Sequence, residues 1–137
     1  MSDASRQSKP AWATRYTVLA GAVDTTTGLL LMLKPALTLA LMGIPQSDGA
    51  PSIFISFVGA FVCGVGLCYL YAAIRGNATL LRHTWELTAL IRLIIATFTA
   101  SAIFTGALSI HWTSIPVTDS LLAVLQIGWL LKWKGTA

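Results

Sequence analysis

The positions of the lysine and arginine residues relative to four long apolar stretches constrain the fold of this chain most strongly. Seven of the nine flank the stretches on what would be one side of a membrane, and they are Arg6, Lys9, Arg15, Arg75, Arg82, Lys132 and Lys134. The other two, Lys34 and Arg92, lie inside or at the end of apolar stretches, and the loops on the opposite side carry neither residue type. Because cytoplasmic loops are enriched in Lys and Arg, the pattern predicts an all-α integral membrane bundle of four transmembrane helices with both termini in the cytoplasm.

The composition agrees with a chain that lies mostly in lipid. It is 55% hydrophobic and 10% charged, whereas soluble domains are about 25% charged. A length of 137 residues is that of one domain, so we expect residues 1–137 to form a single transmembrane domain. The net charge of +4 is spread over helix ends, where membrane insertion and anionic headgroups explain it. The expected environment is therefore the lipid bilayer, and nucleic acid is not an expected partner.

Interruptions of the apolar pattern give approximate limits for the spans. The expected spans are residues 15–33 with a bent extension to residue 43, 52–74, 83–106 and 116–133. The bend is expected because proline at position 35 disfavours helical geometry at Lys34. The turn at residues 75–77 is short and contains Gly76, which suits a helix C-terminus. The second and third spans should therefore form a tight antiparallel hairpin.

Small residues in the first two spans predict close packing between helices. They are Gly21 and Gly28 in the first span, and Gly59, Ala60 and Gly64 in the second. Ala60 and Gly64 form a small-x-x-x-small pair, which allows the backbone of another helix to approach closely. We expect the bundle to pack through these faces.

Ionisable side chains inside the spans mark the candidate site. A charge at the bilayer centre costs ~2.5–3.5 kcal/mol, so such residues usually face the bundle interior and have a partner. Asp24 follows Arg15 by ~13 Å of helix, and Arg92 follows Arg82 by ~15 Å. These similar depths predict a buried Asp24–Arg92 pair. Asp119, ~20 Å from the same edge, is a candidate second acceptor.

Glu86 and Gln126 form a candidate second polar layer, ~6 Å and ~9 Å from that edge. Two interpretations of the whole cluster remain open. It is either an ion pair that fixes which helices pack together, or a polar cavity that handles a proton, an ion or the polar head of a lipophilic substrate. Asp119 is also explained by its place in the first turn of a helix, where a carboxylate complements the dipole. Glu86 is also explained as a solvated acid at the interface.

The remaining polar and aromatic residues point to packing rather than chemistry. His83 and His111 fall on opposite sides of the membrane, so no metal site is predicted, and no cofactor is identified. Cys63 and Cys68 point in different directions on one helix and form no redox pair. Tryptophans near both interfaces are typical of an aromatic belt rather than a ligand cage, and they are Trp12, Trp85, Trp112, Trp129 and Trp133.

Three segments resemble short bacterial four-helix membrane proteins of the DoxX-like group. They are the run GAVDTTTGLLLMLKPALTLALMGIP, the run FVGAFVCGVGLCYLYAAIRGN and the final helix with Asp119 and Gln126. The resemblance covers most of the chain and implies a multi-pass protein of the bacterial inner membrane. Because the group includes an accessory subunit of a quinone-linked oxidoreductase, the resemblance also implies a subunit role. It transfers no catalytic residue.

The leading prediction is a small integral-membrane accessory or scaffold subunit of a larger membrane complex or homo-oligomer. Its partners would be other membrane subunits or a second copy, and the Asp24–Arg92 pair would fix helix packing. One alternative is a small proton-coupled transporter of lipophilic or cationic compounds that uses Asp24, similar to small multidrug transporters with a carboxylate on the first helix. Another is a membrane isomerase that protonates a lipophilic substrate from a buried acid, which requires Asp24 or Glu86 to lie away from Arg92.

Overall fold

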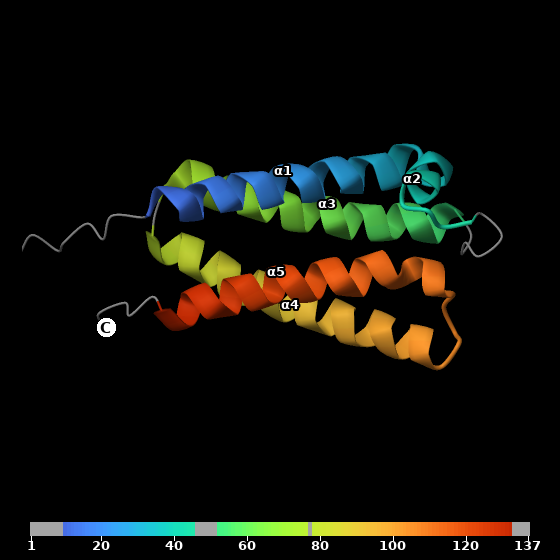
Figure 1. The fold of residues 1–137 in the computed structure, drawn as a ribbon. Helices are drawn as coiled ribbons and strands as arrows, with labels where there is room; N and C mark the ends of the chain where they lie inside the picture. Colours follow the sequence, from blue (N-terminus) through green and yellow to red (C-terminus); the bar gives the residue numbers. More distant parts are fainter. Residues whose placement is uncertain (1–9, 46–51, 77, 133–137) are drawn as a thin grey trace, which may run out of the picture.

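The computed structural model describes residues 10–45, 52–76 and 78–132, which fold into helices joined by short turns (Figure 1). In chain order these are α1 (Ala11–Leu33), α2 (Pro35–Leu41), α3 (Ser52–Arg75), α4 (Ala78–Phe104), the 3-10 helix η2 (Ile110–Thr113) and α5 (Ser114–Lys132). The described residues contain no strand, so the prediction of an all-α fold is confirmed.

Within the described part of the chain, four helical segments are long and apolar enough to cross a membrane. They are Ala11–Leu33, Ser52–Arg75, Ala78–Phe104 and Ile110–Lys132. The two shortest have 23 residues each, or ~34 Å of helix at ~1.5 Å per residue, which exceeds the ~30 Å of a bilayer core. The chain is therefore a multi-pass membrane protein. The first helix begins four residues before the expected start of its span, and η2 lengthens the fourth segment.

The chain bends between α1 and α2 at Lys34, whose φ of −142° and ψ of 59° are not helical. Pro35 has no backbone N–H to continue the hydrogen bonds of α1, and its ring disfavours a helical residue before it. The hydroxyl of Thr38 donates to the Lys34 carbonyl oxygen at 2.9 Å. Leu39 of α2 and Ile44 after it then pack with residues of α1 and α3 in a small apolar cluster. The expected bent extension is thus a separate short helix.

Glycines allow α1 and α3 to pack closely as an antiparallel pair. A Cβ atom added to Gly28 would lie 2.6 Å from the carbonyl oxygen of Gly59, and one added to Gly66 would lie 2.8 Å from that of Gly21. Cβ atoms in proteins essentially never lie within 3.0 Å of another heavy atom. Only glycine therefore allows the two backbones to come so near. Gly66 was absent from the expected packing set.

The expected role of Ala60 and Gly64 in packing within this chain is wrong. Both residues are exposed, and no heavy atom of the described chain lies within 4 Å of a Cβ added to Gly64. At 3.6 residues per turn, positions 60 and 64 are rotated by about 100° and 140° from Gly59. The contact face of α3 therefore turns Gly59 and Gly66 toward α1 and leaves the other two on its outer side.

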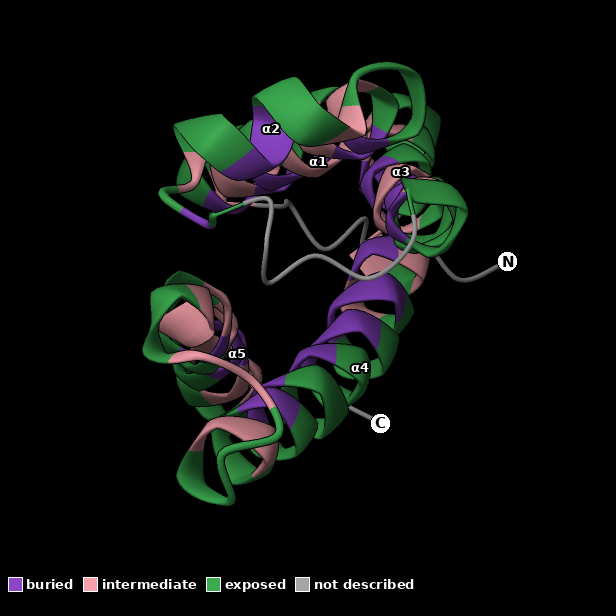
Figure 2. Cartoon of the chain, turned by 90° about the vertical axis from the view of Figure 1, so that its right-hand side faces the viewer, coloured by how far each residue is buried: buried purple, intermediate pink, exposed green. Residues whose placement is uncertain are grey.

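The expected tight hairpin between α3 and α4 is also wrong. The two helices meet at Gly76, whose φ of +68° suits glycine, but α4 then diverges from α3 (Figures 1 and 2). The closely packed pairs are α1 with α3 and α4 with α5. The backbones of α1 and α5 lie apart, with no pair of their Cα atoms within 8 Å. The bundle therefore consists of two packed pairs that open between α1 and α5.

The start of α1, the α3–α4 turn and the end of α5 lie together at one end of the bundle (Figure 1). We call this the basic end, because Arg15, Arg75, Arg82 and Lys132 lie on the helix segments that meet there. The opposite end carries α2 and η2. Four residues of the sequence-based predictions lie outside the described residues, and they are Arg6, Lys9, Trp133 and Lys134.

Candidate functional site

Arg92 lies inside the bundle and links α1 to α5 through two carboxylates. It belongs to α4 and is 5% exposed. Its Nη2 donates to Oδ2 of Asp24 on α1 and its Nη1 donates to Oδ1 of Asp119 on α5, each at 2.5 Å. Both carboxylates are largely buried. We call these three residues the Arg92 triad, and it spans the opening between two helices whose backbones do not meet.

The geometry of the triad suits a structural link. A guanidinium group is planar and presents several N–H donors in fixed directions, so it can bind two carboxylates at once. Charge-assisted hydrogen bonds of this kind are roughly twice as strong as neutral ones. If one carboxylate were removed, the surrounding lipid would supply no water to accept the hydrogen bond from Arg92. The structure therefore brings together the three residues that the depth counts placed near one another.

Tyr69 of α3 extends the triad into a network. Its hydroxyl accepts hydrogen bonds from Nε of Arg92 at 3.5 Å and from Nε2 of Gln126 at 2.6 Å. The same nitrogen of Gln126 donates to Oγ1 of Thr88 at 3.0 Å. Tyr69 and Gln126 are fully buried. The network thus contains side chains from each of the four membrane-crossing segments.

The site residues predicted from the sequence did not include Tyr69 and Thr88. Tyr69 precedes Arg75 by six residues, which places it ~9 Å from the basic end. This is the depth that the sequence gives for Gln126, and Thr88 lies equally far from Arg82. A depth count that included the tyrosine and threonine side chains beside Gln126 would have found this layer.

Glu86 does not belong to the buried cluster with Gln126, and its exposure agrees with the other interpretation, a solvated acid near the helix end. Its carboxylate accepts a hydrogen bond from Nε of Arg82 at 2.9 Å and lies 3.0 Å from Nδ1 of His83. The side chain is 40% exposed. Position 86 is rotated by about 120° from Arg92 on α4, so it faces away from the triad. Among the described residues, no group of three His, Cys, Asp or Glu side chains could hold a metal ion.

Trp85 is a core residue and not part of an aromatic belt, which corrects its expected role. It is 1% exposed, and its Nε1 donates to Oγ1 of Thr17 at 3.0 Å. Its ring centroid lies 6.0 Å from that of Trp12, 4.8 Å from that of Tyr16 and 4.4 Å from that of Trp129. Because its N–H finds a partner inside the protein, this indole does not need interfacial water.

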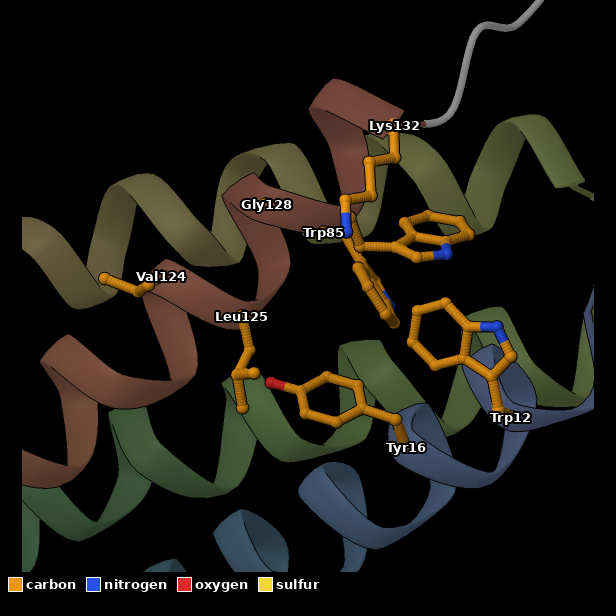
Figure 3. A pocket seen from close by; sticks show the side chains of 8 residues that line it. Trp12, Tyr16, Trp85, Val124, Leu125, Gly128 and Lys132 are labelled. Carbon is orange, nitrogen blue, oxygen red and sulfur yellow. The ribbon is translucent and has the colours of Figure 1, made fainter.

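A cavity of about 500 Å³ lies beside these rings, between α1 and α5 (Figure 3). We call it the α1–α5 groove. Its lining residues are Trp12, Tyr16, Trp85, Val124, Leu125, Gly128, Trp129 and Lys132. Figure 3 shows Trp12 and Tyr16 extending from α1 toward α5, with the Tyr16 hydroxyl directed at Leu125. The groove lies on the basic-end side of the Arg92 triad.

The fold and the buried network define the class of protein, which is an all-α, multi-pass membrane bundle organised around the buried Arg92. Comparisons of the chain with models of protein families, with curated proteins and with solved structures give no match. The resemblance to the DoxX-like group stays a prediction.

We expect Tyr69→Phe to lower the free energy of unfolding by ~1–3 kcal/mol, because it removes an acceptor shared by two buried donors. Chemical denaturation in mixed detergent micelles, followed by tryptophan fluorescence, measures this change. Tyr71→Phe is the matched control, since the Tyr71 hydroxyl accepts a hydrogen bond from Arg75 at the exposed surface. Equal losses of stability in the two variants would contradict a buried network at Tyr69.

Proposed function

We propose that this protein is a small accessory or scaffold subunit of a larger membrane complex or homo-oligomer. We further propose that it resides in the bacterial inner membrane with its basic end in the cytoplasm. The observation that carries the proposal is the Arg92 triad, in which one guanidinium holds carboxylates from two separate helices. Such an arrangement serves to fix helix positions.

The pairing of Asp24 favours a structural role over transport. A carboxylate that loads and unloads a proton or a cationic substrate has to be free of a permanent positive charge. Such a charge favours the ionised form over the protonated form, and it takes the place of a cationic substrate. Arg92 cannot lose its proton in a protein. Asp24 and Asp119 are both bound to it, which disfavours the use of either as a carrier or as a general acid.

The outer face of α3 supports a partner in the membrane. Ala60 and Gly64 are exposed there, and the space beside Gly64 is open to at least 4 Å within the described chain. Without a hydrophobic driving force in lipid, helices associate through small residues that let their backbones approach. This face therefore suits a transmembrane helix of another subunit or of a second copy.

We expect Gly64→Leu to release the partner without unfolding the bundle. Native mass spectrometry of the wild-type protein, extracted with mild detergent, should show a complex heavier than one 14.6 kDa chain, and Gly64→Leu should shift it to the single chain. Ala100→Leu is the control, because Ala100 is an exposed small residue on α4. The proposal fails if the wild-type protein is a single chain or if the Gly64→Leu complex stays intact.

A further inference from the structure

The α1–α5 groove is a ligand-sized space that opens toward lipid. Its volume of about 500 Å³ falls within the range of about 300–1,000 Å³ that small-molecule sites occupy. The groove exists because the Arg92 triad joins α1 and α5 through long side chains while the backbones of these helices remain apart. The space extends along the two helices toward Trp12 and Lys132 at the basic end.

The walls of the groove suit a hydrocarbon chain. Indole rings of Trp12, Trp85 and Trp129 form one wall, and α5 contributes Val124 and Leu125. The floor is widened at Gly128, where a Cβ would meet no heavy atom of the described chain within 4 Å. Aromatic and aliphatic walls offer dispersion contacts along their whole length.

Polar groups are placed where the head of an amphiphile would lie. Lys132, in the last turn of α5, lines the mouth of the groove at the basic end. Arg15 and Arg75 lie on helix segments at the same end, which adds positive charge that attracts anionic headgroups.

We propose that the α1–α5 groove binds one acyl chain of an anionic phospholipid, with the lipid phosphate on Lys132. The occupant follows from the combination of an apolar channel, a cation at its mouth and an opening that faces the bilayer. Bound in this way, the lipid covers the indole rings and fills the gap between the two helix pairs.

The experiment uses the full chain in mixed micelles that contain equal amounts of phosphatidylglycerol and phosphatidylcholine. Native mass spectrometry should show one retained phosphatidylglycerol on the wild-type protein. Gly128→Leu should lose this lipid, because the new side chain fills the groove. Lys132→Gln should still bind lipid but lose the preference for phosphatidylglycerol over phosphatidylcholine.

Gly64→Leu is the matched control, since it adds the same side chain at an equally open glycine outside the groove. It should keep the lipid while losing the protein partner, so failure of this inference and failure of the proposed function are distinguishable. Retention of the lipid by Gly128→Leu, equal retention of both lipids by the wild-type protein, or a different bound lipophile would overturn the inference.

Discussion

Replacing Arg92 with leucine should lower the free energy of unfolding by ~3–5 kcal/mol, because it leaves two buried carboxylates without their counter-ion. Asp24 and Asp119 each bind a separate nitrogen of Arg92, so both carboxylates lose a charged donor when the guanidinium is removed. Denaturation in mixed micelles, followed by tryptophan fluorescence, measures the loss. Arg82→Leu is the control, since its partner Glu86 is exposed and a surface pair contributes at most ~1 kcal/mol.

Removal of the whole triad distinguishes a structural link from a reactive site. Asp24→Asn and Asp119→Asn together should destabilise the bundle, because the Arg92 charge is then stranded. Addition of Arg92→Leu to that double variant should restore part of the stability, since no buried charge remains. A carrier role for Asp24 predicts instead that Asp24→Asn leaves stability unchanged and abolishes transport across proteoliposome membranes.

Gly28→Leu should separate α1 from α3 and lower the free energy of unfolding by ~3 kcal/mol or more. Overpacking usually costs ~1–3 kcal/mol, but here the obstacle is backbone that no side-chain rotation can move. A Cβ at Gly28 would lie 2.6 Å from the Gly59 carbonyl oxygen and nearer still to the backbone of Cys63. The same denaturation assay, together with cross-linking between cysteines placed on α1 and α3, reports the loss of stability and the separation.

Gly64→Leu is again the matched variant, because it makes the same change of residue in a membrane helix. Its added side chain meets open space, so we expect the unfolding free energy of the single chain to stay within about 0.5 kcal/mol of the wild-type value. Any gain in helix propensity from replacing glycine is common to both variants. A similar loss in both would mean that glycine is required for a reason other than close packing.

The residues of the triad could be predicted because lipid forces ionised groups to find partners, and distance along a helix gives their depth. The same count failed for Glu86, since depth carries no information on the direction around the helix. The direction around the helix also determines which small residues of α3 pack against α1: Gly66 faces α1, whereas Gly64 does not. The presence of glycine at both positions does not predict which of them lies in the contact.

The α1–α5 groove could not be predicted for a different reason. Its walls come from segments at opposite ends of the chain, such as Trp12 and Trp129, and its existence depends on how far α4 diverges from α3. A short turn at Gly76 indicates that two helices are neighbours at that turn, but it does not set the angle between them. The packing of side chains far from the turn sets that angle.

The order of the triad along the chain also suits synthesis from the N-terminus. Gly21 and Gly28 of α1 lie against α3, and Gly59 and Gly66 of α3 lie against α1, so this pair can close as soon as α3 has entered the membrane. Arg92 follows on α4, when Asp24 is already in place to receive it, and Asp119 arrives last on α5. The arginine therefore meets a carboxylate when it enters the membrane, and the growing chain does not have to hold it alone in lipid.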